Sequence, residues 1–262
     1  MKEFRNQTAL ITGASAGIGE AFARKLASRG ANLFLVARTE EKLRSLSDEL
    51  QNSYGVRADY FALDLSTDGA AARLFDETDR HGVKVDLLIN NAGFGSFGEF
   101  CALPVERELQ MIHLNIVALV DLTHRYLNAM LARRRGAIIN VASTAGFQPL
   151  PFMATYAATK AFVLNFSEAL WVECKDRGVQ VLAACPGATR TEFFDAARVK
   201  GRPPDAMMQS ADEVVESALA ALAARQSSVI SGWKNRVVIA LSRLAPRRLT
   251  LAVAARITAR RD

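Results

Sequence analysis

Cysteine and histidine are scarce in this chain of 262 residues, with three of each. Neither set has the close spacing of metal ligands, and an odd number of widely separated cysteines favours a reducing compartment over a disulfide framework. The six positions are Cys101, Cys174 and Cys185, and His81, His113 and His124. The sequence therefore predicts no metal site and no disulfide-bonded scaffold.

Long hydrophobic runs are also absent. No segment reaches the roughly 18 apolar residues that a membrane-spanning helix needs, and the charged residues 1–6 are not followed by the apolar stretch of a signal peptide. Hydrophobic residues make up 50% of the chain and charged residues 23%, which is ordinary for a globular protein. We therefore expect a cytoplasmic protein built on one core.

Net positive charge is absent outside the C-terminal end. The chain carries a net charge of +6, but residues 227–262 alone contain eight basic residues and one acidic residue. The rest of the chain therefore has a net charge of −1. This distribution argues against a nucleic-acid-binding body and assigns the basicity to the tail.

A strand, a glycine-rich loop and a helix open the chain. Residues 8–12 are β-branched and apolar, residues 13–19 read Gly-Ala-Ser-Ala-Gly-Ile-Gly, and residues 20–29 are amphipathic. Glycines let the backbone approach a phosphate closely, and the helix presents free N–H groups to it. The stretch predicts a pyrophosphate site, although its glycine spacing departs from the general G-x-G-x-x-G pattern, and a tight structural turn is the alternative.

The same loop allows an enzyme of another class. Residues 13–17 match the G-x-S-x-G turn of α/β-hydrolases, with Ser15 as the nucleophile. Such an enzyme needs an acid and then a histidine further along the chain. The last histidine is His124, and the turn would follow the first strand, so the sequence disfavours a serine hydrolase.

The end of the second expected strand, residues 32–37, bears on the choice of cofactor. It is followed by Arg38 and then by a helical stretch over residues 40–50. In a dinucleotide-binding fold an acid at this point binds the ribose 2′-hydroxyl, whereas an arginine accommodates a 2′-phosphate. Arg38 therefore indicates NADP(H); a solvated arginine is the alternative, and Glu40 complicates the local charge.

Polar residues follow the next two expected strands as well. Residues 56–63 precede Asp64 and Leu65, and residues 85–89 precede Asn90-Asn91-Ala92-Gly93. Ligands of open parallel sheets lie beyond the carboxyl ends of the strands, so these positions suit a binding crevice. Turn formation alone would explain either one.

The strongest chemical pattern lies between Ser143 and Lys160. Residues 137–142 form a strand-like run that ends in Ser143, and Tyr156 and Lys160 fall one turn apart on a helix that begins near Phe152. A lysine charge beside a tyrosine favours the phenolate, so we expect the pKa of Tyr156 to be lowered towards neutral pH. Ser143 could bond a carbonyl oxygen.

A long helix and a late loop complete the pattern. Residues 105–133 have apolar residues at helical spacing with Asn115 among them, which predicts a buried asparagine with hydrogen-bond partners. Residues 179–185 form a sixth strand that ends in Pro186-Gly187, and residues 188–210 form a polar loop typical of a lid. A helix over residues 212–225 and a short strand over residues 228–231 follow.

In their order and spacing these motifs resemble the short-chain dehydrogenase/reductase family over about residues 5–231. The resemblance implies one α/β domain, residues 1–231, with a Rossmann-like doubly wound parallel sheet in strand order 3-2-1-4-5-6-7. It also implies hydride transfer between a nicotinamide and the carbonyl or alcohol carbon of a substrate. Family members often pair through their long helices, so a homodimer or homotetramer is implied.

The resemblance assigns roles by position. Tyr156 would be the general acid in reduction, Lys160 would lower its pKa and hold the nicotinamide ribose, Ser143 would bond the substrate oxygen, and Asn115 would support a proton-relaying water. The remaining cofactor contacts implied are Gly13, Ser15, Gly17, Ile18 and Gly19 at the pyrophosphate, Asp64 and Leu65 near the adenine, Asn91, Ala92 and Gly93 along the ribose, and Pro186, Gly187, Thr189 and Thr191 beside the nicotinamide.

The substrate is expected to be apolar. Large apolar residues flank the site motifs, which favours a ketone, an acyl group or a steroid-like molecule, although core packing explains some of them equally well. They are Phe94, Phe97, Phe147, Phe152, Phe193, Phe194, Met207 and Met208. A catalytically silent NADP(H)-binding regulatory protein remains open as an alternative function.

The basic C-terminal extension, residues 232–262, is amphipathic. Apolar residues at helical spacing form one set before Pro246 and a second set after it, with arginines between them. They are Trp233, Val237, Leu241 and Leu244, and then Leu249, Val253 and Ile257. Such a segment packs on the body or on a neighbouring subunit, or it makes a peripheral contact with an anionic membrane surface.

Overall fold

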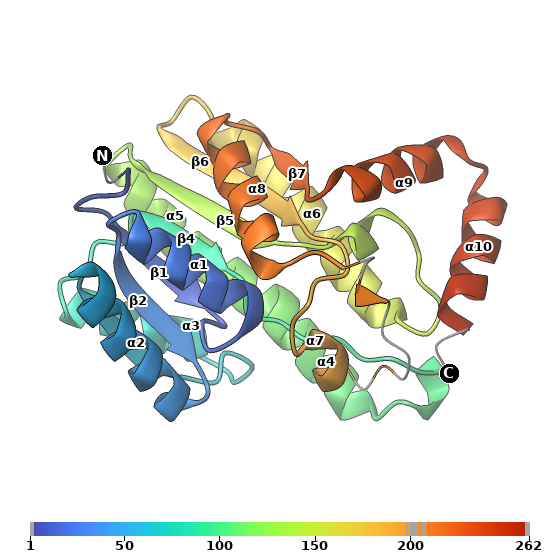
Figure 1. The fold of residues 1–262 in the computed structure, drawn as a ribbon, viewed down its shortest axis with the longest axis horizontal. Coiled ribbons are helices and arrows are strands. Elements are labelled where there is room, and N and C mark those ends of the chain that lie inside the picture. Colours follow the sequence, from blue (N-terminus) through green and yellow to red (C-terminus); the bar gives the residue numbers. More distant parts are fainter. Residues whose placement is uncertain (1–2, 198, 200–203, 206–207, 260–262) are drawn as a thin grey trace.

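Seven parallel strands form one sheet in the order β3-β2-β1-β4-β5-β6-β7, which confirms the expected doubly wound topology (Figure 1). The structure is a computed structural model and describes residues 3–197, 199, 204–205 and 208–259. Met207 and the last three residues, Arg260, Arg261 and Asp262, lie outside this range. The strands are β1 (Thr8–Thr12), β2 (Asn32–Ala37), β3 (Ala58–Ala62), β4 (Leu87–Asn90), β5 (Gly136–Val141), β6 (Val179–Cys185) and β7 (Ser228–Ile230).

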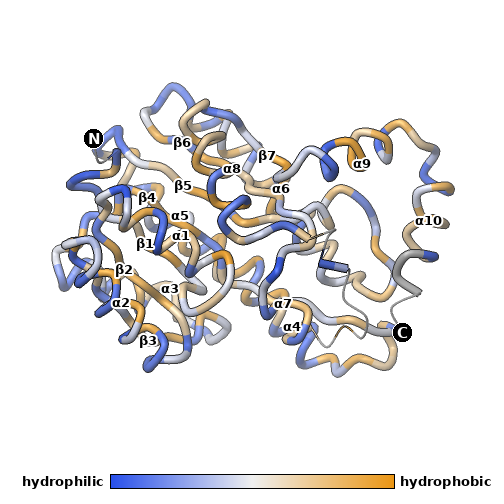
Figure 2. Tube along the Cα trace, in the orientation of Figure 1, coloured by the Kyte–Doolittle hydropathy of each residue, from blue (hydrophilic) through white to orange (hydrophobic). Residues whose placement is uncertain are grey.

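Helices cover both faces of this sheet (Figure 1). One apolar layer packs α1 (Gly17–Ser28), α2 (Glu40–Tyr54) and α8 (Ala211–Ala223) against the strands. The opposite layer contains α3 (Ala70–Arg80), α5 (Leu119–Ala132) and α6 (Ala154–Cys174). The central strands are hydrophobic on both sides, as strands buried between two helical layers must be (Figure 2).

The helix expected over residues 105–133 is divided into three parts. An α-helix, α4 (Val105–Ile112), continues into a π-helical turn, η2 (His113–Ala118), and then into α5. The wider turn falls at Asn115, and such turns are rare and frequent at functional sites. Residues 70–80, for which the sequence predicted no element, form helix α3, which buries one face against the sheet.

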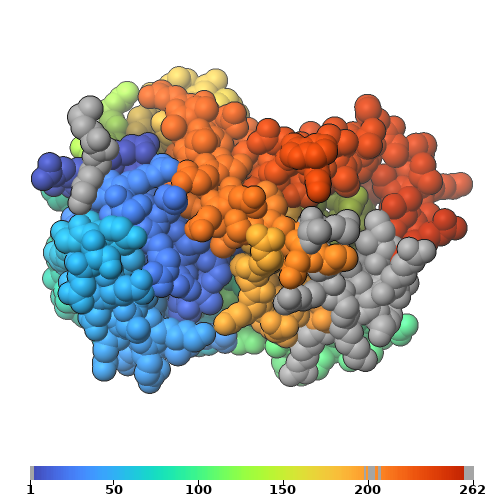
Figure 3. Space-filling view, in the orientation of Figure 1, coloured from blue at the N-terminus to red at the C-terminus, as the bar shows by residue number. Residues whose placement is uncertain are grey.

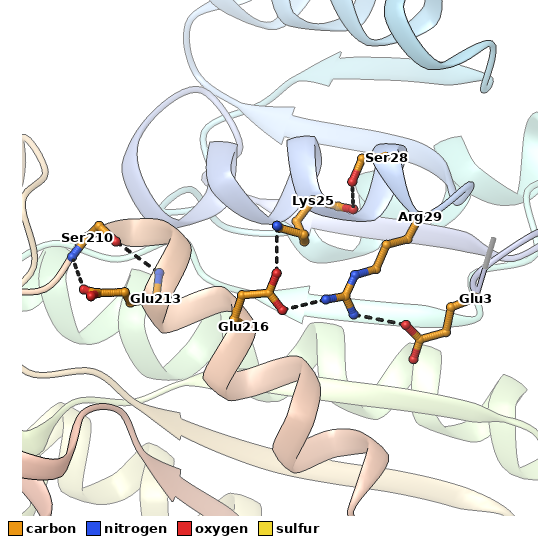
Figure 4. Close-up of polar contacts among 7 residues, drawn as sticks. All are labelled: Glu3, Lys25, Ser28, Arg29, Ser210, Glu213 and Glu216. Carbon is orange, nitrogen blue, oxygen red and sulfur yellow. Dashed lines mark hydrogen bonds and ion pairs between the residues drawn. The ribbon is translucent and has the colours of Figure 1, made fainter. Parts of the chain in front are cut away.

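Ion pairs join α1 to α8 and to the N-terminal segment (Figure 4). Glu216 on α8 accepts from Lys25 at 2.7 Å and from Arg29 at 2.6 Å, and Arg29 also pairs with Glu3 at 3.0 Å. All four side chains are partly exposed, so the pairs add modestly to stability beside the apolar layer beneath them.

A capping box fixes the start of α8, where the loop expected to be a lid ends. The Ser210 hydroxyl accepts from the Glu213 backbone at 3.2 Å, and the Glu213 carboxylate accepts from the Ser210 backbone at 2.8 Å (Figure 4). An isolated bridge between Thr189 and Gln209 closes the base of the loop. Within the loop, α7 (Phe193–Ala196) forms a single short turn of helix.

Two helices follow the sheet. Helix α9 (Trp233–Leu244) leaves β7, and α10 (Arg247–Ala259) lies at the end of the molecule away from β1 to β3 (Figure 1). Both are at the surface, drawn in red in Figure 3. No helix within the described residues is both long enough and apolar enough to cross a membrane.

Candidate active site

A cavity of about 560 Å³ opens beyond the carboxyl ends of β1, β4, β5 and β6. Its lining runs from Arg38 past the glycine loop to Tyr156, and then to the loop before α8 and to helix α9. Ligands of doubly wound sheets bind at this edge. Most of the residues that the sequence singled out therefore face one shared space.

The glycine loop is packed too closely for larger residues. Gly13 and Gly17 have φ values of 66° and 60°, which side chains rarely adopt, and a Cβ on Gly19 would lie 2.1 Å from the Gly13 carbonyl oxygen. Helix α1 begins after Ala16 without a side-chain cap, so the first N–H groups of the helix remain available to an anion. The loop fits the pyrophosphate of a dinucleotide.

Thr12 ties this loop to the end of β4. Its hydroxyl donates to the Ile89 carbonyl at 3.2 Å and accepts from the backbone N–H groups of Asn91 and Ala92, both at 3.0 Å. The Asn91 amide donates to the Thr12 carbonyl at 2.9 Å and to that of Gly13 at 3.2 Å. These bonds hold the pyrophosphate loop and the Asn91–Gly93 stretch as two walls of one crevice.

Arg38 lies at the far end of the cavity with two neighbours that the sequence reading did not select, Thr39 and Lys42. Asp64 does not line the cavity, because its carboxylate accepts from the backbone and hydroxyl of Ser66 at 2.9 and 2.7 Å. Burial raises the pKa of Asp64, but the Ser66 hydrogen bonds and the Arg38 charge outweigh burial and hold the pKa below its ordinary value.

Two further predicted cofactor contacts are also absent from the lining. Leu65 is buried in the apolar layer that contains α3 and α5, and Gly19 lies behind Gly13. The other predicted contacts all line the cavity. These are Gly13, Ser15, Gly17, Ile18, Arg38, Asn91, Ala92, Gly93, Tyr156, Lys160, Pro186, Gly187, Thr189 and Thr191.

Ser143, Tyr156 and Lys160 meet at the centre of the cavity. Ser143 follows β5, and Tyr156 and Lys160 lie on the first two turns of α6. All three side chains are buried. The Ser143 hydroxyl acts to lower the pKa of the neighbouring Tyr156 phenol, and it donates to the Pro186 carbonyl at 3.5 Å. The Lys160 ammonium donates to the Val141 carbonyl at 2.8 Å and lies 5.9 Å from the centre of the Tyr156 ring.

Burial dominates the ionisation of this pair. It raises the pKa of Tyr156 to about 12, an effect that Ser143 only partly offsets. Burial also lowers the pKa of Lys160 to about 8. The expectation that Lys160 lowers the pKa of Tyr156 is wrong here, because the cost of desolvating the phenolate exceeds any benefit from a lysine charge that is itself desolvated.

Asn115 lies behind the cavity wall, not on it. Its amide donates to the Phe94 carbonyl at 3.0 Å and to the Thr159 hydroxyl at 3.1 Å, and its oxygen accepts from the Phe94 backbone at 3.2 Å. The expected partners of a buried asparagine are therefore present. Through them Asn115 fixes the wall that follows Gly93 against helix α6.

A buried polar chain sets the position of α6 on the sheet. The Asn90 amide donates to Thr123 at 3.0 Å and to the Asn140 side chain at 2.9 Å. Asn140 in turn donates to Ser167 on α6 at 2.9 Å. This chain crosses β4 and β5 and joins the helices on that face, so it limits how far Tyr156 and Lys160 can shift relative to Ser143.

Apolar side chains form the wall facing Tyr156. Phe193 lies 5.2 Å from the Tyr156 ring, measured between ring centres. Of the eight apolar residues chosen from the sequence, Phe94, Phe193 and Phe194 line the cavity. The described residues that do not line it are Phe97, Phe147, Phe152 and Met208.

Helix α9 contributes three residues that the sequence reading assigned to a separate extension. Asn235, Val238 and Ile239 line the cavity, and Ile239 is buried. The Asn235 amide donates to the Ser231 carbonyl at 2.8 Å. Only the helical spacing of α9 hinted at packing, and nothing in the sequence showed which surface it would cover.

The histidines do not take part in this site. His81 contacts Glu77, His113 contacts Asp68, and His124 contacts Asn128, whereas the lining of the cavity contains no histidine. Ser15 therefore has no histidine base beside it. The described residues also contain no group of three or more histidine, cysteine or acidic side chains that could hold a metal ion.

Comparison with known proteins agrees with this fold. A family model described as short chain dehydrogenase matches residues 7–200. The chain therefore belongs to the short-chain dehydrogenase/reductase family.

Individual relatives add detail. The 7beta-hydroxysteroid dehydrogenase of Collinsella aerofaciens is 35% identical over 239 residues, which cover 90% of each chain. A structure from a study of 7beta-hydroxysteroid dehydrogenase stereoselectivity is 31% identical, covers 97% of this chain and 98% of the other, and gives a TM-score of 0.88. A short-chain dehydrogenase from Sphingobium yanoikuyae in complex with NADPH is 36% identical, covers 86% and 87%, and gives 0.81.

The lowered pKa of Lys160 predicts a pH-dependent stability. An unfolded lysine keeps its proton to a pKa near 10.5, whereas folded Lys160 loses it near pH 8, so the unfolded chain binds more protons between these values. The free energy of unfolding of the wild type, relative to Lys160→Met, should therefore rise with pH, by about 2 kcal/mol from pH 8 to pH 10. Urea denaturation across this range measures it.

The exposed Lys84 provides the control. The free energy of unfolding of the wild type, relative to Lys84→Met, should show no such rise with pH. A difference between the wild type and Lys160→Met that stays flat from pH 8 to pH 10 would show that Lys160 keeps an ordinary pKa.

Proposed function

We propose that this protein is an NADP(H)-dependent oxidoreductase that interconverts a ketone and an alcohol on an apolar, steroid-sized substrate. One observation carries the proposal: the buried group of Ser143, Tyr156 and Lys160 faces the same cavity as the glycine loop and Arg38. The family membership and the NADPH complex of the Sphingobium yanoikuyae relative support it.

The residues of the chain divide the chemistry. The bound cofactor supplies or accepts a hydride at the substrate carbon. With its raised pKa, Tyr156 stays protonated at neutral pH and donates that proton to the substrate oxygen during reduction. Ser143 orients the same oxygen by a hydrogen bond, and Lys160, charged below about pH 8, stabilises negative charge that develops on Tyr156.

The walls of the cavity favour an apolar substrate. Phe193, Leu150 and Met153 line the space beside Tyr156, and Val238 and Ile239 approach it from α9. Such a lining binds a rigid hydrocarbon body with few polar contacts. The hydroxysteroid dehydrogenases among the relatives support a steroid-like ketone, and an acyl substrate is the second choice.

Two other functions are weaker. A silent NADP(H)-binding regulatory protein needs the cofactor walls but not the buried Ser143, Tyr156 and Lys160 group. A serine hydrolase that uses Ser15 needs a histidine base, which the lining of the cavity does not supply. Turnover of NADPH with a panel of apolar ketones separates the proposal from both.

Removing the phenol of Tyr156 tests the reaction. Tyr156→Phe should lower kcat at least about 100-fold, since general acid catalysis contributes a factor of this order, while NADPH affinity stays nearly unchanged. Steady-state kinetics and fluorescence titration of NADPH measure the two effects. The control is Tyr126→Phe, which removes a buried phenol that bonds Thr78 in the core, far from the cavity lining. Equal turnover of the two variants would refute the assigned role.

The cofactor preference depends on Arg38. A guanidinium that bonds a 2′-phosphate contributes ~1.5–3 kcal/mol, so NADPH should bind more tightly than NADH, and Arg38→Ala should narrow the gap by that amount. Arg57→Ala is the control, because Arg57 is exposed, pairs with Asp59 and lies at the amino ends of the strands, whereas Arg38 lies at their carboxyl ends. Equal affinity of the wild type for both cofactors would show that Arg38 does not select NADP(H).

We also propose a homo-oligomer in which a second copy covers α9. Trp233, Val237, Leu241 and Leu244 are between 48% and 85% exposed, so the apolar stripe expected from the sequence points away from the body. A contact with an anionic membrane is less favoured, since Arg243 stacks on Phe147 and Arg236 donates to the Ile230 carbonyl. These two charges are turned towards the protein. The long helices carry a second apolar set, which consists of Val117, Phe162 and Val172.

Shortening the chain tests this assignment. A chain ending at Ser231 should form smaller assemblies than the full chain, measured by light scattering, and the exposed substitution Leu241→Asn should have the same effect in the full chain. Co-sedimentation with anionic vesicles at low salt distinguishes the membrane alternative. Vesicle binding that truncation abolishes, without any change in assembly size, would favour the membrane over the second copy.

A further inference from the structure

A second basic side chain faces the end of the cavity where Arg38 lies. Lys42 is on the first turn of α2, four residues after Arg38, and both residues line the cavity together with Thr39. The glycine loop, where a pyrophosphate fits, borders the same space. Two cations therefore face the region next to the adenosine end of a dinucleotide, although the sequence motif accounts for only one of them.

The acids around this pair leave Lys42 available. Glu40, which could neutralise the site, pairs with Arg44 at 3.1 Å, and Arg44 is held in turn by the Tyr60 hydroxyl at 3.1 Å. Glu40 therefore already has a basic partner other than Lys42. Among the described residues, Arg38 forms no ion pair within 4.0 Å.

Lys42 itself has one acidic partner, which comes from the opposite wall. The carboxylate of Glu192, just before α7, lies 3.8 Å from the Lys42 ammonium, and both residues line the cavity. The two side chains are 53% and 73% exposed, so this pair is weak and can be exchanged for a stronger partner. A phosphate dianion held beside Arg38 is such a partner.

We propose that Lys42 is the second cation of a 2′-phosphate site and that Glu192 competes with the phosphate for it. The inference rests on the proposed NADP(H) function. With a 2′-phosphate in place, Lys42 acts as a point charge beside the bidentate guanidinium of Arg38. With a 2′-hydroxyl in place, Lys42 stays paired with Glu192. Glu192 thereby adjusts how strongly the protein discriminates between the two forms of the cofactor.

Calorimetry with 2′,5′-ADP and 5′-AMP tests the role of Lys42 without any turnover. In the full chain, Lys42→Met should weaken the binding of 2′,5′-ADP about tenfold, the fold-change expected for one hydrogen bond between charged groups. The affinity for 5′-AMP should stay within about twofold of the wild type. Lys84→Met, which removes an exposed lysine at the amino ends of the strands, is the charge-matched control. It should change neither affinity.

Glu192→Gln tests the competition. It should tighten the binding of 2′,5′-ADP about threefold and leave the affinity for 5′-AMP unchanged. The control is Glu106→Gln, which removes an exposed acid on α4 and should change neither affinity. Combined with Lys42→Met, the gain from Glu192→Gln should vanish, because the two residues act through one contact.

The outcomes separate the inference from the function beneath it. If the wild type prefers 2′,5′-ADP and Lys42→Met binds 2′,5′-ADP as tightly as the wild type does, Lys42 is not a phosphate ligand, and the proposed function stands. If the gain from Glu192→Gln persists without Lys42, Glu192 acts on the phosphate directly and the competition is wrong. If the wild type binds both nucleotides equally or binds neither, the proposed NADP(H) function fails together with the inference.

Discussion

The hydroxyl of Thr12 is the constraint on which the site depends. It lies at the carboxyl end of β1, the strand from which the chain order runs outward in both directions, towards β2 on one side and β4 on the other. Loops leaving such a point diverge and open a crevice. By bonding the Ile89 carbonyl and two N–H groups after β4, Thr12 fixes how far the two walls separate. The close approach of Gly13 and Gly19 to the Asn91 amide then leaves no room for a side chain at either of these two positions.

Desolvation shifts the pKa of Tyr156 upwards, in the opposite direction to the shift expected from the neighbouring charge of Lys160. Burial pushes both Tyr156 and Lys160 towards their neutral forms, so the phenol remains a proton donor through the neutral range. The protonated phenol is the form that can donate to a substrate oxygen in the reduction proposed above. The ammonium of Lys160 meanwhile depends on the Val141 carbonyl, a fixed backbone dipole, for its compensation.

Much of the fold could be predicted because its determinants are local in sequence. The apolar runs gave β1, β2 and β6 with their observed bounds, and ordered motifs at strand ends identified the family. The site was harder to predict from the sequence wherever it depends on tertiary packing. Asp64 looked like a ligand, but its bonds to Ser66 turn it into a local cap. Lys42 was not selected from the sequence, since helical spacing alone does not show which wall it faces.

Helix α9 is the clearest case in which the sequence did not predict the tertiary contacts. Its basic and amphipathic character suggested an appendage after residue 231, yet Asn235 lies so close to Gly187 that a Cβ there would be 2.3 Å from the Asn235 amide. The helix is thus seated directly on the turn after β6, and it supplies Val238 and Ile239 to the cavity.

The family match ends at residue 200, before this helix begins. The residues proposed for proton transfer and phosphate binding therefore lie within the family match, whereas Val238 and Ile239 of the apolar wall lie beyond it. The two walls of the cavity are built from separate elements, since Tyr156 lies on α6 and Val238 and Ile239 lie on α9.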